Sequence, residues 1–314
     1  MKKKLVAGAV TLLSVVTLAA CANGTNKDVV TMKGDTITVS DFYNEIKTNQ
    51  GAQQVLFQMT INKVFEKEYG SKVSDKEVDK ELAKQKKQLG NRFDAYLAQQ
   101  GLTEETAKKQ IRSNMLLEYA VNQAAKKDIK ESDYKAAFES YTPEVTAQII
   151  KLDSEDKAKE VLEAAKAEGA DFAQIAKDNS TDTATKDKGG EVKFDSGTAD
   201  IPSQVKEAAF KLDENGISDV ITVSAGQNYS ASYYIVKLNK KTEKGSDWKK
   251  YEKRLKEIIV DGRKQDTNYI RSIIAKAMTN ANIKVKDDAF KSTFNQYLQN
   301  IGVQTSDSSS SSKK

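Results

Sequence analysis

Apolar positions between residues 29 and 142 follow a helical pattern after one short alternating stretch. Residues 29–39 alternate around Lys33-Gly34-Asp35, which suits a tight hairpin turn. Ser40-Asp41 has the residue types of a helix N-cap. A helical apolar stripe then runs up to Gly70, formed by Phe57, Ile61, Val64, Phe65 and Tyr69. The sequence therefore predicts one hairpin followed by helices.

The helices that follow Gly70 are bounded by their own start and stop signals. Ser74 and Glu77 have the spacing of a capping box, and Gly90 follows the apolar stripe that this box opens. Thr103 opens a second long helix. Its predicted inner stripe is Ala107, Ile111, Met115 and Tyr119.

The pattern changes at Pro143 and stays different up to residue 240. Residues 145–149 alternate as a strand, and the two stretches after them have helical spacing. Further strands are predicted at residues 191–194, 219–224 and 232–238, with a short helix that begins at Pro202. Residues 143–240 therefore form a predicted α+β domain of ordinary size.

Helical spacing returns in residues 241–303. Three apolar stripes carry it: Trp248, Tyr251, Leu255, Ile258 and Ile259; then Ile270, Ile273, Ile274 and Ala277; and finally Phe290, Phe294, Leu298 and Ile301. Residues 304–314 are rich in serine and hold too few apolar side chains for a core, so we expect a disordered tail.

The first 28 residues have the features of an export signal. Lysines at positions 2–4 precede a short apolar segment, which predicts a signal peptide over residues 1–20. The tetrapeptide Leu18-Ala19-Ala20-Cys21 resembles a bacterial lipobox, in which the cysteine thiol is lipidated. Residues 21–28 would then be a lipidated tether on the outer face of the cytoplasmic membrane. The alternative is an ordinary secretory signal with an unmodified thiol.

Composition excludes several classes of chemistry. Apolar residues make up 38% of the 314 and charged residues 30%, which is too polar for a protein with many membrane spans. The net charge of +5 is small, so a dedicated nucleic-acid binder is not expected. Histidine is absent and cysteine occurs once, which removes Ser-His and Cys-His catalysis, histidine-ligated zinc and intrachain disulfides. We expect no cofactor and no metal, because residues 178–182 lack the glycine and glutamate of a calcium loop.

Several short motifs, in this order and spacing, resemble the PrsA-type foldase lipoproteins over nearly the whole chain. They are the lipobox, residues 30–43, Asp171-Phe172-Ala-Gln-Ile-Ala176, Gly189-Gly190, Ala208-Ala209-Phe210 and residues 215–220. The resemblance implies an α+β fold in which residues 29–142 and 241–303 form one mostly helical, SurA-like chaperone domain. The parvulin-like domain at 143–240, a small antiparallel sheet wrapped by helices, would be inserted in it.

The same resemblance implies site residues and shows where the chain departs from the family pattern. The two histidines that parvulins usually carry align with Gln148 and Tyr234, and the usual pocket residues align with Ile201 and Val205, while Phe210 is retained. Gln148 and Tyr234 would be catalytic positions, and the other three would bind substrate. The alternatives are ordinary polar residues for the first pair and plain domain core for the other three.

Three functions from different classes follow. The first is an extracytoplasmic foldase with a peptidyl-prolyl isomerase domain, acting on unfolded or partly folded secreted proteins. The second is a non-catalytic holdase or docking lipoprotein on the same scaffold. The third is a solute-binding lipoprotein of an importer, which requires repeated β-α units that the long helical flanks do not show. The apolar stripes would serve a homodimer as readily as a monomer.

Overall fold

The computed structural model describes residues 27–224 and 231–298, with the side chains of residues 296–298 left out. Contacts between residues divide the chain into two units, residues 1–70 with 274–314 and residues 71–273. Each unit is described below by itself. The predicted signal peptide, Cys21 and the serine-rich tail lie outside the described residues, and so does Ile301.

The first unit opens with the predicted hairpin. Strand β1 (Asp28–Met32) pairs antiparallel with β2 (Asp35–Thr38). Helix α1 (Val39–Ile46) follows at once, and its N-cap is Thr38, whose side chain accepts from the backbone N–H of Asp41. The expected N-cap at Ser40-Asp41 was therefore wrong by two residues. Asp41 is the third helical residue, and its carboxylate accepts from the backbone N–H of Thr38.

Helix α2 (Gln50–Tyr69) of this unit packs against α12 (Lys291–Leu298), which lies far away in the sequence. The ring of Phe57 meets that of Phe294 at 5.5 Å between centroids, and the Thr293 hydroxyl donates to the Gln53 side chain at 3.0 Å. Four of the five predicted α2 stripe residues are buried: Phe57, Ile61, Val64 and Phe65. The fifth, Tyr69, stacks on Phe65 at 5.9 Å. A 3-10 helix, Asp288–Phe290, leads into α12.

The second unit begins with α3 (Asp75–Leu89), α4 (Phe93–Gln99) and α5 (Glu104–Lys127). The capping box at Ser74 and the N-cap at Thr103 are confirmed. The stripe predicted on α5 holds only in its first half, because Leu116 and Ala120 are buried where Met115 and Tyr119 were expected. At 3.6 residues per turn Leu116 lies about 180° around the helix from Ala107. The buried face of α5 therefore changes along its length, because the helix packs against both α3 and α10.

After α5 comes α6 (Glu131–Ser140), and both helices pack against α10 (Glu252–Gln265). The Arg263 guanidinium donates to the Ala125 carbonyl at 2.9 Å and to the Asp133 carboxylate at 2.7 Å. Trp248, in the 3-10 helix Trp248–Tyr251 that precedes α10, stacks on Tyr134 at 5.1 Å. Helix α11 (Thr267–Asn280) follows after a break at Asp266. No helix within the described ranges is long and apolar enough to cross a membrane.

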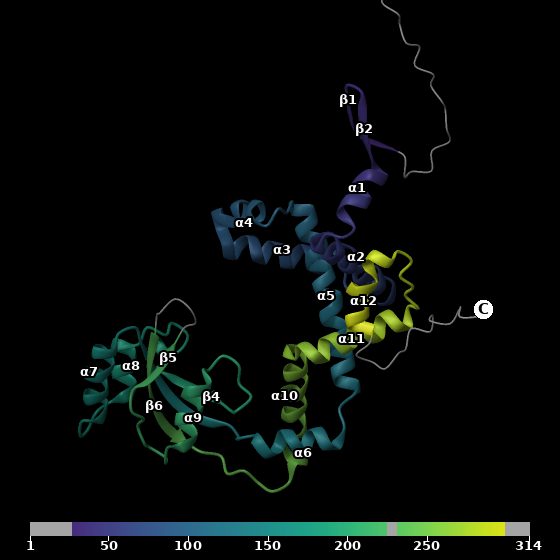
Figure 1. Ribbon diagram of the computed structural model, residues 1–314. Helices are drawn as coiled ribbons and strands as arrows, with labels where there is room; N and C mark the ends of the chain where they lie inside the picture. The colour runs from purple at the N-terminus through teal and green to yellow at the C-terminus, as the bar shows by residue number, and fades with distance from the viewer. Residues whose placement is uncertain (1–26, 225–230, 299–314) are drawn as a thin grey trace, which may run out of the picture. The chain divides into compact units, whose positions relative to one another are not determined.

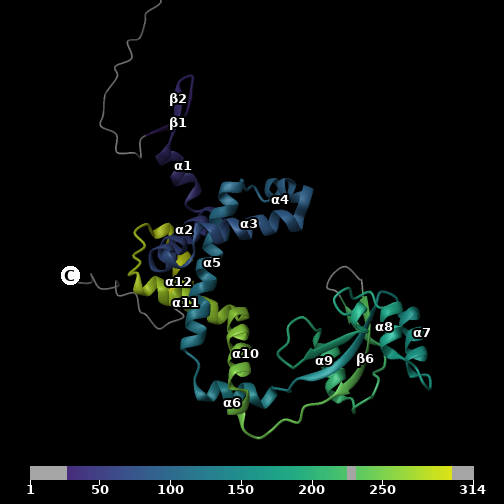
Figure 2. The same cartoon turned by 180° about the vertical axis from the view of Figure 1, so that it is seen from behind.

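Between α6 and α10 the chain forms an antiparallel sheet of four strands in the order β4-β3-β6-β5. They are β3 (Val145–Leu152), β4 (Glu191–Phe194), β5 (Ile221–Ser224) and β6 (Ala231–Lys240). Helices α7 (Glu155–Lys166) and α8 (Phe172–Asn179) cover one face, and α9 (Ser203–Lys211) covers the other (Figures 1 and 2). The expected small antiparallel sheet wrapped by helices is confirmed, and so is the α+β fold class.

Candidate functional site

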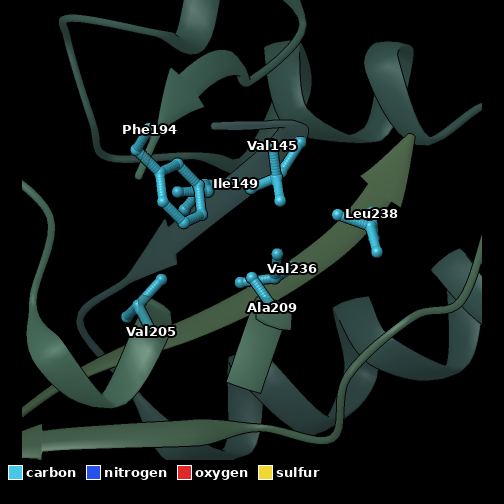
Figure 3. Close-up of a cluster of buried hydrophobic side chains, with 8 residues drawn as sticks. Val145, Ile149, Phe194, Val205, Ala209, Val236 and Leu238 are labelled. Carbon is cyan, nitrogen blue, oxygen red and sulfur yellow. The ribbon is translucent and has the colours of Figure 1, made fainter. Parts of the chain in front are cut away.

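The face of the sheet that α9 covers holds a cluster of fully buried apolar side chains. Strands β3, β4 and β6 contribute to it, and α9 closes it from one side (Figure 3). Val205 and Ala209 project from α9 toward the sheet, into the same cluster that Phe194 enters from the end of β4 (Figure 3). The members are Val145, Ala147, Ile149, Phe194, Val205, Ala209, Val236 and Leu238. This cluster is the rigid floor of the candidate site.

Partly exposed apolar side chains pack around this floor and are the candidate binding surface. They are Val192, Ile201, Phe210, Leu212, Ile221, Val223 and Tyr234. The Phe210 ring lies 5.8 Å from that of Phe194, which fixes its position at the end of α9. An apolar surface of this kind, supported by a dry core, can hold the side chain of a proline residue.

Four of the five predicted site residues of this domain lie together here. Ile201, Phe210 and Tyr234 are half-buried in the surface, whereas Val205 is fully buried. Val205 therefore supports the surface from below. The helix predicted to begin at Pro202 begins one residue later, at Ser203, and Pro202 is its N-cap residue, which carries the chain from Ile201 into the helix.

Gln148 lies elsewhere. Its neighbours Ala147 and Ile149 face the α9 cluster, so alternation along the strand turns Gln148 to the face that α7 and α8 cover. There its side-chain amide donates to the Gly189 carbonyl at 2.9 Å. The structure therefore brings Tyr234 to the apolar surface and leaves Gln148 on the opposite face.

An ionic cluster beside the floor was missed by the sequence reasoning. Asp195, the residue after Phe194, is 6% exposed and pairs with Arg254 of α10 through two hydrogen bonds, 2.6 Å from Nε to Oδ2 and 2.8 Å from Nη2 to Oδ1. The Tyr141 hydroxyl donates to the same Oδ2 at 3.1 Å, and the Thr198 hydroxyl donates to Oδ1 at 3.0 Å. The sequence carries no local signal for this pair, because 59 residues separate its members.

These contacts shift the ionisation of the groups involved. Burial by itself raises the pKa of the Asp195 carboxyl, but the hydrogen bond and charge of Arg254, together with the hydrogen bonds from Thr198 and Tyr141, outweigh it, so this pKa lies below its ordinary value. Burial and the Asp195 charge raise the pKa of the Tyr141 hydroxyl. The hydrogen bond to Asp195 raises the pKa of Arg254. At neutral pH the cluster is one anion, one cation and one neutral phenol.

A small antiparallel sheet with helices on both faces and an apolar surface over α9 is the arrangement of a parvulin-type peptidyl-prolyl isomerase domain. A family model described as rotamase, PPIC-type PPIase domain, matches residues 142–240 of the chain.

Two foldase proteins PrsA match over almost the full length. That of Streptococcus sanguinis strain SK36 is 62% identical over 96% of this chain and 90% of that protein, and that of Streptococcus gordonii strain Challis is 60% identical over the whole of both. A crystal structure of foldase protein PrsA from Streptococcus pneumoniae is 55% identical, covers 86% of this chain and 99% of its own, and superposes with a TM-score of 0.78. The chain belongs to the PrsA foldase family and is a foldase with a parvulin-type isomerase domain.

Proposed function

We propose that the isomerase domain catalyses the cis-trans isomerisation of X-Pro bonds on the apolar surface above Phe194. The observation that carries this proposal is the gathering of Ile201, Phe210 and Tyr234, all half-exposed, over a fully buried floor. Nothing in the reaction requires a nucleophile, because no bond is broken and only rotation about the amide C–N bond is slow. The absence of histidine from the chain therefore does not exclude the reaction.

The chemistry follows from how the amide changes as it rotates. The barrier is about 18–20 kcal/mol, because twisting removes the resonance of the C–N bond. The twisted amide is less polar than the planar one, so an apolar surface that sheds water favours it. Each 1.4 kcal/mol of such preference speeds the reaction about tenfold.

We assign different roles to the two residues at the histidine positions. Tyr234 lies in the apolar surface, where its hydroxyl can donate to or accept from the substrate backbone. Gln148 is a positioning residue, because its amide holds the Gly189 carbonyl at 2.9 Å and so fixes the Gly189-Gly190 turn against β3.

The test is a protease-coupled isomerisation assay with a proline tetrapeptide and the full mature chain. We expect a rate that rises with enzyme concentration, and a fall of about tenfold or more in kcat/KM for Ile201→Ala, which corresponds to about 1.4 kcal/mol. Ile175→Ala is the matched control, since Ile175 is also half-buried but packs on the opposite face of the sheet. A wild-type rate equal to that of buffer eliminates turnover, and equal losses in both variants eliminate this surface.

The proposed setting is the outer face of the cytoplasmic membrane, with secreted proteins as clients. The lipobox-like sequence that ends in Cys21 supports a lipid anchor, and a chain that has just been exported is unfolded when it reaches this face. Isomerisation of X-Pro bonds takes tens to hundreds of seconds, so catalysis there shortens folding.

Labelling with a radioactive fatty acid tests the lipid anchor. We expect Cys21→Ser to lose the label and to be released from the cell, and a labelled Cys21→Ser variant would contradict the proposal.

A holdase activity is the second candidate, because the first unit exposes large apolar side chains. They are Val29, Val30, Met32, Ile37, Phe42, Tyr43, Val55 and Met59, each 40% exposed or more. The register of the hairpin puts Val30, Met32 and Ile37 on one face. Suppression of the aggregation of a refolding client tests this activity, and we expect Phe42→Ser with Met59→Ser to weaken it. Sedimentation of the same variants tests whether a homodimer covers this surface instead.

A further inference from the structure

The loop between β4 and α9, residues 195–202, carries Ile201 to the candidate surface. The hydrogen bonds that fix this loop lie almost entirely in its first half. Thr198 folds back onto Asp195, with its hydroxyl donating to the carboxylate and its backbone N–H donating to the Asp195 carbonyl at 3.2 Å. The backbone N–H of Gly197 donates to the same carboxylate at 3.0 Å. The carboxylate of Asp195 therefore accepts the hydrogen bonds that hold the first half of the loop together.

Arg254 supplies the contact from outside the isomerase domain. Its guanidinium meets the carboxylate with two parallel hydrogen bonds, which is the strongest geometry for such a pair. The carboxylate side chain is 7% exposed and that of Arg254 is 34% exposed, so the pair is shielded on the Asp195 side. Without Arg254 a buried anion would be left with neutral donors alone.

Contacts on the outer side of the loop show that it packs against α10. A Cβ atom at Gly197 would overlap the Ile258 side chain, one turn along α10 from Arg254. On the other side Lys206 of α9 donates to the carbonyls of Ser196 and Thr198, at 2.9 and 2.6 Å. The loop is thus held between the first turn of α9 and the flanking helix.

We propose that Arg254 is a positioning residue of the isomerase site. Through Asp195 it holds loop 195–202 in the shape that packs Ile201 against the buried cluster on which Phe210 also packs. The flanking helical segment, which packs on α5 and α6, thereby completes a site that the isomerase domain forms only in part. This inference rests on the proposed function of the surface, and its test separates the two.

The variants are Arg254→Gln and Arg254→Lys in the full mature chain. Lys256→Gln is the matched control, because Lys256 is an exposed cation on the same helix. Each is measured for kcat and KM with a proline tetrapeptide and for amide hydrogen exchange in loop 195–202 and in β3. We expect Arg254→Gln to raise KM about tenfold with a smaller change in kcat, and to speed exchange in the loop alone. Arg254→Lys, which keeps the charge but loses the paired geometry, recovers part of the loss.

Two results overturn the inference while leaving turnover intact. One is a wild-type KM in Arg254→Gln. The other is faster exchange throughout β3, which means that the domain has been destabilised as a whole. If the wild-type chain itself shows no turnover, the proposed function fails, and the Kd of the same tetrapeptide, followed by NMR, takes the place of KM. A Kd equal in wild type and Arg254→Gln, or no binding by either, then overturns the role of Arg254.

Discussion

Replacing Gly190 by alanine tests how closely the Gly189-Gly190 turn approaches β3. Gly190 has φ +77°, and its carbonyl accepts from the Ile149 N–H at 2.8 Å. An added Cβ would lie 2.5 Å from the Ile149 carbonyl oxygen and 3.0 Å from its nitrogen. Both are backbone atoms of a central strand, so they cannot turn away as a flexible side chain does.

Gly169 provides a matched control in the same domain. Its φ is +76°, and nothing lies within 4 Å of the position that a Cβ would take. Left-handed backbone costs alanine about 1–2 kcal/mol at either site. Gly190→Ala adds the cost of overpacking against β3, typically about 1–3 kcal/mol. The effect of glycine on the unfolded chain is common to both variants and cancels.

The assay is differential scanning calorimetry of the full mature chain, with hydrogen exchange in β3 to assign the transition of the isomerase domain. For a domain of this size, about 1 kcal/mol corresponds to about 4–8 °C in Tm. We therefore expect the Tm of Gly190→Ala to fall below that of Gly169→Ala by at least about 4 °C. Equal Tm values for the two variants would refute the argument from close approach.

Three further predictions concern other parts of the molecule. Phe210→Ala removes a half-buried ring that packs on Phe194 and should destabilise the isomerase domain by about 2–3 kcal/mol, measured by urea unfolding; a change below about 0.5 kcal/mol would contradict this packing. Ser74→Ala removes the N-cap of α3 and should cost about 1 kcal/mol, seen as faster hydrogen exchange in that helix, whereas unchanged exchange would show that the cap is not needed. The lowered pKa of Asp195 means that the ionised carboxylate stabilises the folded domain fully above the ordinary carboxyl pKa of about 4. This stabilisation is lost as the pH falls through the lower pKa of the folded state. Between about pH 5 and pH 2 the Tm of the wild-type domain should therefore fall by more than the Tm of Asp195→Asn. Parallel curves of Tm against pH for the two proteins would contradict the link to Arg254.

Local signals in the sequence account for most of the helices. Ser74 and Thr103 are N-caps in the structure, and α9 begins within one residue of Pro202, because each of these signals acts through residues within one helical turn. The hairpin at Gly34 also formed as expected. The misplaced N-cap at Ser40 shows the limit of this reasoning, since serine is the better cap residue by type, but β2 ends at Thr38 and the helix starts directly after it.

The candidate site was predictable only in part. The apolar residues Ile201 and Phe210 were found through the family pattern, but the pattern does not show which face of the sheet each position takes. Strand register decides that point: Tyr234 pairs with Lys151, and Gln148 pairs with Lys237, so the two aligned positions point to opposite faces. The Asp195–Arg254 pair depends on a contact between distant segments, which no local pattern encodes.

The most direct test of the central claim is two-dimensional NMR exchange spectroscopy of a proline tetrapeptide with a small, substoichiometric amount of the full mature chain. The claim is that an apolar surface isomerises the X-Pro bond without an imidazole. We predict exchange cross-peaks between the cis and trans forms that grow with protein concentration and weaken in Ile201→Ala but not in Ile175→Ala. Exchange at the rate of the free peptide, at every protein concentration, would contradict the claim.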